Sequence, residues 1–256
     1  MPEYISFPVI GGDRVAVTLP DKAATLAEAE ARLRDGRGFA LATINLDHLT
    51  KLRRDRAFAE AYLAQDMVVA DGNPIVWLSA LAGKPTGLVP GSELVDPLAA
   101  ICARIGAPLA MLGTTEAALA AAEAELVRRH PGLRVAAAIS PPMGFDPASA
   151  AADAFIDRIE ASGARLCLLA LGAPKQEILA ARARGRAPGI GFVSVGAGVD
   201  FVAGTQKRAP VWARRAKMEW AWRMLSDPRR LFKRYAECFA ILPGLALQAW
   251  KDRAHG

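Results

Sequence analysis

The sequence predicts an α/β fold built on a parallel sheet flanked by helices. From Phe39 onward, short apolar runs alternate with longer stretches rich in Ala, Leu, Glu and Arg, which is the pattern of parallel strands linked by helices. The apolar runs end in small or polar residues such as Gly, Asp, Asn and Thr, as strands do where they meet loops. The chain has 256 residues and is 52% hydrophobic, which is enough for one large domain with a sizeable core.

Six apolar runs are expected to form the strands of this sheet. They are Phe39–Thr43, Met67–Ala70, Leu109–Leu112, Val135–Ile139, Leu166–Leu171 and Phe192–Val195. Between them, apolar residues that repeat every three or four positions predict crossover helices. The clearest of these helices are Glu116–Arg129, Ala148–Glu160 and Lys175–Arg184. Near the N-terminus, the apolar residues on either side of Gly11-Gly12-Asp13 predict a small hairpin that adds an edge to the sheet.

The C-terminal part of the chain has a different character. Residues 207–256 hold 12 Lys and Arg against 4 Asp and Glu, whereas the rest of the chain holds 20 against 22, and four of the five tryptophans lie beyond residue 210. We therefore divide the chain into a sheet domain, residues 1–205, and a basic, aromatic, helical appendage, residues 206–256. Such side chains suit a membrane boundary, and they suit equally a helix that packs its aromatic residues onto the main domain.

Several features bear on where the protein works. Cys102, Cys167 and Cys238 are far apart in apolar surroundings, which predicts reduced core thiols. The N-terminus lacks the basic and apolar regions of a secretory signal. The apolar stretch Cys238–Leu247 is too short to cross a bilayer and is interrupted by Pro243-Gly244. We expect a cytoplasmic protein whose contact with a membrane is peripheral.

Candidate functional residues follow the predicted strands, because reactive groups gather at the carboxyl ends of parallel strands. In chain order they are Thr43, Asn45, Asp71, Gly72, Asn73, Gly113, Thr114, Pro141, Gly172, Lys175, Gln176, Glu177, Gly196 and Asp200. Glycines there let a ligand approach backbone N–H groups, and helix N-termini favour a diphosphate. Taken singly, however, a glycine after a strand is more often just part of a turn.

Asp71 differs from the other candidates because it stands between the apolar run Met67–Ala70 and the helix-starting pair Asn73-Pro74. A carboxylate in partly apolar surroundings can serve as a general base when its pKa is raised. An Asp before Pro is equally common as a helix cap or in an Asx-turn. Lys175 and Gln176 open a predicted helix, where they can meet a phosphate or a sugar hydroxyl, or simply face solvent.

Missing signatures narrow the choice of function. The chain has no complete G-x-G-x-x-G after its first core strand, no Walker A loop and no G-x-S-x-G elbow. It also lacks an Asp-x-Asp pair, and its three histidines are not spaced as metal ligands. We expect no metal site and no cofactor. Arg mixed with aromatic residues also occurs in single-strand nucleic-acid binders, but this alternative leaves the strand-end residues without a role, so we expect no nucleic-acid partner.

Taken in order, the strand-end motifs resemble those of the WecG/TagA/CpsF family of glycosyltransferases, from about Val9 to Tyr235. Each motif is short, but the ordered set is specific. It comprises Thr43-Ile44-Asn45, Ala70-Asp71-Gly72-Asn73-Pro74-Ile75, Leu171-Gly172-Ala173-Pro174-Lys175-Gln176-Glu177, Val195-Gly196-Ala197-Gly198-Val199-Asp200-Phe201, Ala203-Gly204, Arg208-Ala209-Pro210, Glu219-Trp220, Arg223 and Pro228-Arg229-Arg230-Leu231.

The resemblance implies a Rossmann-like transferase that needs no metal ion and inverts the anomeric carbon. It further implies a UDP-sugar donor, a polyprenyl-diphosphate-linked sugar acceptor, and an appendage that closes the site and touches the inner face of the bacterial inner membrane. Asp71 matches the family's proposed base, and Thr43 and Gln176 match positions at the donor or the reacting sugar, with Asn45 supporting Thr43. For the leaving diphosphate, the candidates by position are Arg208, Arg215, Arg223 and Arg230.

One departure from the family pattern bears on the donor. Where the family often has Arg-Val-x-Gly-x-Asp-Leu, this chain reads Leu88-Val89-Pro90-Gly91-Ser92-Glu93-Leu94. Some members transfer N-acetylmannosamine and others glucose or related hexoses, and the missing arginine speaks against N-acetylmannosamine. The main alternative is the same fold with a non-lipid acceptor, which would leave the appendage as packing only. Self-association of the chain is left open.

Overall fold

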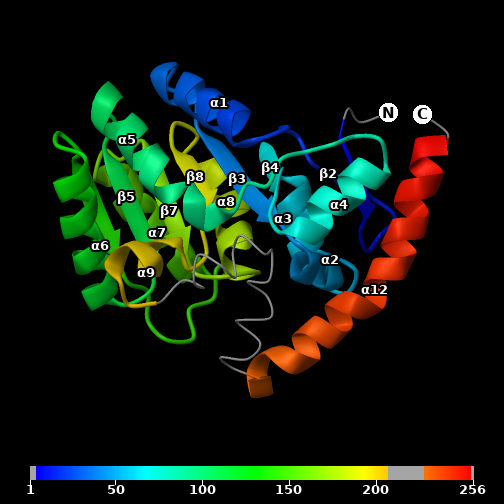
Figure 1. Cartoon of the computed structure of the whole chain (residues 1–256). Coiled ribbons are helices and arrows are strands. Elements are labelled where there is room, and N and C mark those ends of the chain that lie inside the picture. The colour runs from blue at the N-terminus through cyan, green and yellow to red at the C-terminus, as the bar shows by residue number, and fades with distance from the viewer. Residues whose placement is uncertain (1–3, 207–227, 255–256) are drawn as a thin grey trace.

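The computed structural model describes residues 4–206 and 228–254, and it contains the predicted parallel sheet (Figure 1). All six predicted strands are confirmed. They are β3 (Phe39–Ile44), β4 (Met67–Ala70), β5 (Leu109–Gly113), β6 (Val135–Ile139), β7 (Leu166–Ala170) and β8 (Gly191–Ser194). All pairings between them are parallel, and the strand order is β4-β3-β8-β7-β5-β6. The fold is therefore the α/β, Rossmann-like class that the sequence predicts.

The order of the strands places the first and last strands of the six-stranded sheet side by side. After β4, at one edge, the chain crosses to β5 and β6 in the other half of the sheet and returns through β7 to β8. The last strand, β8, thus lies beside the first core strand, β3, and Phe39 pairs with Gly191. A Cβ at Gly191 would lie 2.6 Å from the Phe39 ring, so this close pairing requires glycine.

Helices cover both faces of the sheet. Their bounds are α1 (Lys22–Arg34), α2 (Leu46–Leu52), α3 (Arg56–Leu63), α4 (Asn73–Leu81), α5 (Val95–Ile105), α6 (Glu116–Arg129), α7 (Ala150–Ala161), α8 (Lys175–Arg186), α9 (Gly198–Ala203) and α12 (Pro228–Ala254), with a 3₁₀ turn at Gly91–Glu93. Helices α1, α5, α6 and α9 bury their apolar side chains on one face, and α7 and α8 do so on the other. Alternate residues of β5, β7 and β8 supply these two cores, as a sheet buried on both faces requires.

The N-terminal hairpin does not extend the main sheet as expected. β1 (Ser6–Pro8) and β2 (Arg14–Ala16) form a separate two-stranded antiparallel sheet, and residues 9–13 make the connection. Its link to β4 runs through Thr18, whose backbone N–H donates to Val68 O at 2.8 Å and whose hydroxyl accepts from Val68 N at 2.9 Å. The hairpin buries Phe7 and Val15 in a third core. This burial, rather than ladder pairing with β4, holds it in place.

Helix α12 packs along α2 and α4 (Figure 1). Cys238, Leu245 and Ala249 are buried there in the same core as the hairpin. Pro243 lies inside the helix rather than ending it.

All three cysteines are free and buried, as predicted. No helix in the described ranges 4–206 and 228–254 is long and apolar enough to cross a membrane.

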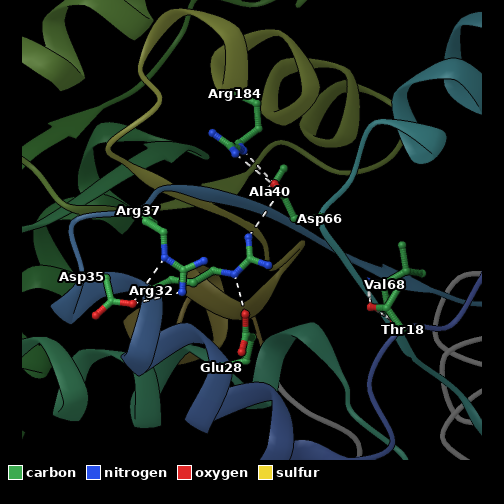
Figure 2. Close-up of polar contacts among 9 residues, drawn as sticks. All are labelled: Thr18, Glu28, Arg32, Asp35, Arg37, Ala40, Asp66, Val68 and Arg184. Atoms are coloured by element: carbon green, nitrogen blue, oxygen red, sulfur yellow. Dashed lines mark hydrogen bonds and ion pairs between the residues drawn. The ribbon is translucent and has the colours of Figure 1, made fainter.

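At the amino edge of the sheet, Asp66 ties three elements together (Figure 2). Its carboxylate accepts hydrogen bonds from Ala40 N in β3 at 2.8 Å and from Arg184 Nε in α8 at 2.7 Å, and Arg32 in α1 lies 3.3 Å away. Burial alone would raise the pKa of Asp66, but these hydrogen bonds and the two guanidinium charges lower it below its usual value. A pocket of about 370 Å³ opens beside these arginines, next to Gly36 and Gly189.

We expect Asp66→Asn to lower the free energy of unfolding by about 2 kcal/mol, because it leaves two partly buried guanidinium groups without their carboxylate. The matched control is Asp35→Asn. Asp35 pairs with Arg37, and both side chains are more than half exposed, so this variant should change stability by less than about 0.5 kcal/mol. Urea unfolding at pH 7 measures both. Equal losses in the two variants would show that Asp66 does not tie the elements together.

Candidate active site

Thr43, Asp71 and Gln176 come from three separate segments and meet at the carboxyl edge of the sheet. Thr43 lies at the end of β3, and Asp71 follows β4, where its backbone N–H donates to Ile44 O at 2.8 Å. Gln176 is in the first turn of α8, and its Oε1 accepts a hydrogen bond from Gly196 N, just after β8, at 3.1 Å. Because β3 lies between β4 and β8, the three residues lie along the same edge of the sheet, near the ends of these three strands.

Thr43 is held tightly at this edge, since it is only 4% exposed. Its carbonyl oxygen accepts a hydrogen bond from Tyr62 OH at 3.1 Å. The segment after Leu88 packs against it at Gly91, where a Cβ would lie 3.3 Å from Thr43 Oγ1 and 2.9 Å from Ser194 O. The Ser194 carbonyl oxygen leaves no room for a side chain at position 91, so this close packing needs glycine.

The structure tests one expectation for Asp71, its role as the N-cap of α4. The N-cap of α4 is Gly72, which has a φ of 91° and provides no side-chain cap. Asp71 therefore lies one residue before the cap, so the expectation that it caps the helix is wrong. Asn73 is the first residue of α4. Asn45 has a structural task, because its Oδ1 accepts from His48 N at 3.0 Å and caps α2.

Below Thr43 lies a buried polar pair that sequence reasoning missed. His48 Nδ1 is 2.7 Å from Tyr62 OH, and since that hydroxyl donates to Thr43 O, it accepts from a protonated Nδ1. Burial disfavours the charged imidazolium and lowers the pKa of His48 to about 4. Burial also raises the pKa of Tyr62 above its usual range, as do the charges of Glu177 and Asp71. Both residues lie on apolar helix faces, and their spacing in the sequence predicts only a place in the core.

Glu177 is one of the residues expected to bind substrate, but none of its surface is exposed. Its Oε1 accepts a hydrogen bond from Gln176 Nε2 at 2.8 Å. Burial raises the pKa of Glu177 to about 7, although the hydrogen bond from Gln176 and the charge of Lys51 act in the opposite direction. Glu177 thus lies behind Gln176, inside the protein.

A second group of candidates lies further along the same edge. Thr114 has a φ of 45°, and its hydroxyl donates to Asp200 Oδ1 at 2.5 Å. Gly113 has a φ of 130°, and a Cβ there would lie 2.3 Å from Ala170 O. Ser140, which precedes Pro141, donates its hydroxyl to Thr114 O at 2.7 Å. These contacts tie the ends of β5, β6 and β7 to the start of α9.

The remaining candidates fall into two sets. Partly buried residues at the carboxyl edge are Pro141, Gly172, Lys175 and Gly196. Three of the tail arginines, Arg208, Arg215 and Arg223, lie outside the described residues, and Arg230 belongs to α12.

In the part of the chain that the structure describes, no group of three or more His, Cys, Asp and Glu is placed to hold a metal ion.

Residues 12–255 of this chain match the sequence model of the glycosyl transferase WecG/TagA/CpsF family. The match spans nearly the whole chain, including both groups of residues at the carboxyl edge and α12. It agrees with the family that the strand-end motifs indicate.

We expect the stability of the protein to fall as the pH is lowered from about 6.5 to about 4, in part because of His48. In this range the unfolded chain protonates His48 and the folded protein does not, which costs about 3 kcal/mol by pH 4. His48→Asn keeps an N–H donor for Tyr62 and cannot titrate, so it should lose this part of the slope. Urea unfolding of both proteins between pH 4 and pH 7 measures it. Identical slopes would mean that His48 is protonated in the folded state.

Proposed function

The chain belongs to the WecG/TagA/CpsF family of glycosyltransferases, and from this premise we propose that it moves a hexose or N-acetylhexosamine from a UDP-sugar to a polyprenyl-diphosphate-linked sugar. The family places the transfer in cell-surface polysaccharide synthesis. The observation that supports the proposal is the placement of Thr43, Asp71 and Gln176 at neighbouring strand ends along the carboxyl edge. In open α/β sheets, this edge is where ligands bind.

In the proposed reaction Asp71 is the general base. Its carboxylate takes the proton from an acceptor sugar hydroxyl while that oxygen attacks the anomeric carbon of the donor. The bond between the anomeric carbon and the diphosphate oxygen breaks on the opposite side, and its electron pair leaves with UDP. The configuration at the anomeric carbon is inverted. Thr43 and Gln176 hold the donor or the reacting sugar in line, which supplies the orientation that the transfer requires.

The leaving diphosphate needs positive charge or aligned donors. The N-terminus of α8 can supply both, because Lys175 is the first residue of the helix and carries a positive charge. The chain turns just before it at Gly172, which has a φ of 70°. We assign further positive charge to Arg208, Arg215, Arg223 and Arg230 by their positions in the family pattern. The proposal includes no metal ion and no cofactor.

The exposed surface of helix α12 supports the proposal that the acceptor is carried in a membrane. Four large apolar side chains of α12 are between 47% and 68% exposed, namely Phe232, Phe239, Leu247 and Trp250. At 100° per residue they fall within an arc of about 80°. The buried face of α12 lies roughly 140° around the helix from the centre of this arc. We call these four residues the apolar row. The exposed Lys233 and Lys251 border it, as cations border the apolar face of an interfacial helix.

We therefore propose that the protein works as a peripheral protein on the inner face of the bacterial inner membrane, with residues 206–256 as the membrane-associating appendage. The lipid-linked acceptor would reach the carboxyl edge of the sheet from that surface. A transferase with a non-lipid acceptor would have no use for the apolar row. The proposal does not require self-association.

Asp71→Asn tests the chemistry. With a panel of UDP-sugars, a synthetic prenyl-diphosphate sugar and EDTA, we expect the variant to lower kcat for UDP release by about 10³-fold, because the proton has no acceptor. The KM for the donor should stay within about threefold, since the amide keeps the size of the carboxylate. Asp35→Asn, at the opposite edge, is the control and should keep the full rate. A fully active Asp71→Asn variant would remove Asp71 from the mechanism.

Leu247→Ser with Trp250→Ser tests the membrane surface. We expect the double variant to bind vesicles of anionic phospholipid at least about tenfold more weakly than the wild type, because it loses apolar area that enters the lipid. Val127→Ser, on an exposed site of α6, is the matched control and should bind as the wild type does. Co-sedimentation with the vesicles measures all three. Unchanged binding by the double variant would exclude the apolar row as the membrane contact.

A further inference from the structure

We infer that Glu177 is a positioning residue: its buried carboxyl group holds the side-chain amide of Gln176 in one orientation, so that the amide presents one N–H to the substrate. The part of this inference that concerns a substrate rests on the proposed function. The part that concerns the amide rests on hydrogen bonds inside the protein and stands without it.

The amide of Gln176 is held at both of its ends. Oε1 accepts from Gly196 N at 3.1 Å, and Nε2 donates to Glu177 Oε1 at 2.8 Å. Turning the amide over would bring its oxygen against the carboxyl oxygen of Glu177 and its NH₂ against the N–H of Gly196. Both contacts would be repulsive. Glu177 and Gly196 therefore leave a single orientation for the amide.

This orientation determines what Gln176 offers at the carboxyl edge. Nε2 carries two hydrogens, and Glu177 accepts one of them. The second hydrogen is available to a ligand at the edge where Thr43 and Asp71 lie. The side chain is only 3% exposed, so little freedom remains to it. The result is a preorganised donor, which is the arrangement that catalysis by positioning requires.

The surroundings of Glu177 suit this task better than a purely structural one. Among the described residues, no group forms a hydrogen bond with its Oε2, although that atom is buried. Such a carboxyl oxygen costs stability. The charge of Lys51 from α2 acts on Glu177, and Glu177 in turn acts on Tyr62 from α3, as does Asp71 after β4. None of them replaces Glu177 as the acceptor for Gln176 Nε2.

Burial raises the pKa of Glu177 to about 7, so its titration can be followed in the pH range where the folded protein is studied. Oε1 accepts from Gln176 in either protonation state, and the ionised state accepts more strongly. The amide protons of Gln176 should therefore report the titration of Glu177. Glu177→Gln keeps an oxygen acceptor but cannot titrate. Glu177→Met keeps the length of the side chain and removes the acceptor.

The first experiment follows the side-chain amide protons of Gln176 by NMR in the full chain labelled with ¹⁵N-glutamine. The chain has four glutamines, and Gln176→Glu identifies the signal. In the wild type we expect one downfield Nε2 proton whose shift titrates near pH 7. Glu177→Gln should keep the downfield proton and lose the titration, and Glu177→Met should lose both, with exchange at least about tenfold faster. If Glu177→Met does not fold, the Glu177→Gln arm decides alone. An amide signal that is the same in all the folded proteins would overturn the inference.

The second experiment measures UDP release with the donor and acceptor that the wild type uses. Glu177→Met should lower kcat by about 10- to 100-fold with little change in KM, and Glu177→Gln should restore kcat to within about threefold of the wild type. A full rate for Glu177→Met, or an equal loss in both variants, would overturn the inference while leaving the transfer reaction intact. If the wild type turns over no donor, the proposed function fails, and the NMR result still decides whether Glu177 orients Gln176.

Discussion

The pairing of β3 with β8 is the contact on which the rest of the site depends. It joins the first and last strands of the sheet, so that Thr43 and Gly196, far apart in the chain, end at the same edge. Gln176, which follows β7, can bond to Gly196 because β8 also pairs with β7. Glycine at position 191 permits this pairing, since a side chain there would collide with Phe39.

A layer of buried polar groups supports this edge from below. Tyr62 and His48 hold the end of β3, and Glu177 holds Gln176. All of these residues are nearly inaccessible to solvent, and each costs free energy of desolvation unless it is hydrogen-bonded. In return, the groups that we assign to the substrate are fixed by rigid helices and strands rather than by loops alone. The second group, around Thr114 and Asp200, is likewise tied back to neighbouring strand ends.

Much of the fold, and part of the site, could be predicted from the sequence. Buried parallel strands are continuous apolar runs, so β3 to β8 could be located. The rule that ligands meet the carboxyl ends placed Thr43, Asp71 and Gln176 among the strand-end candidates, and the resemblance to the family distinguished them from the others. The strand order could not be predicted, because the crossing from β4 to β5 leaves no local signal. Tyr62 and His48 look like ordinary core residues in helices. Glu177 looked like a partner of the ligand because it follows Gln176, and only its burial shows that it lies behind that residue.

The central claim is that the donor binds at the carboxyl edge of β3, β4 and β8. Amide hydrogen exchange of the full chain, with and without UDP, tests it most directly. UDP should slow exchange at Gly72, Asn73 and Gly196 and leave exchange at Gly36 and Gly189 unchanged. Slower exchange confined to Gly36 and Gly189, beside the arginine-lined pocket at the opposite edge, would contradict the account.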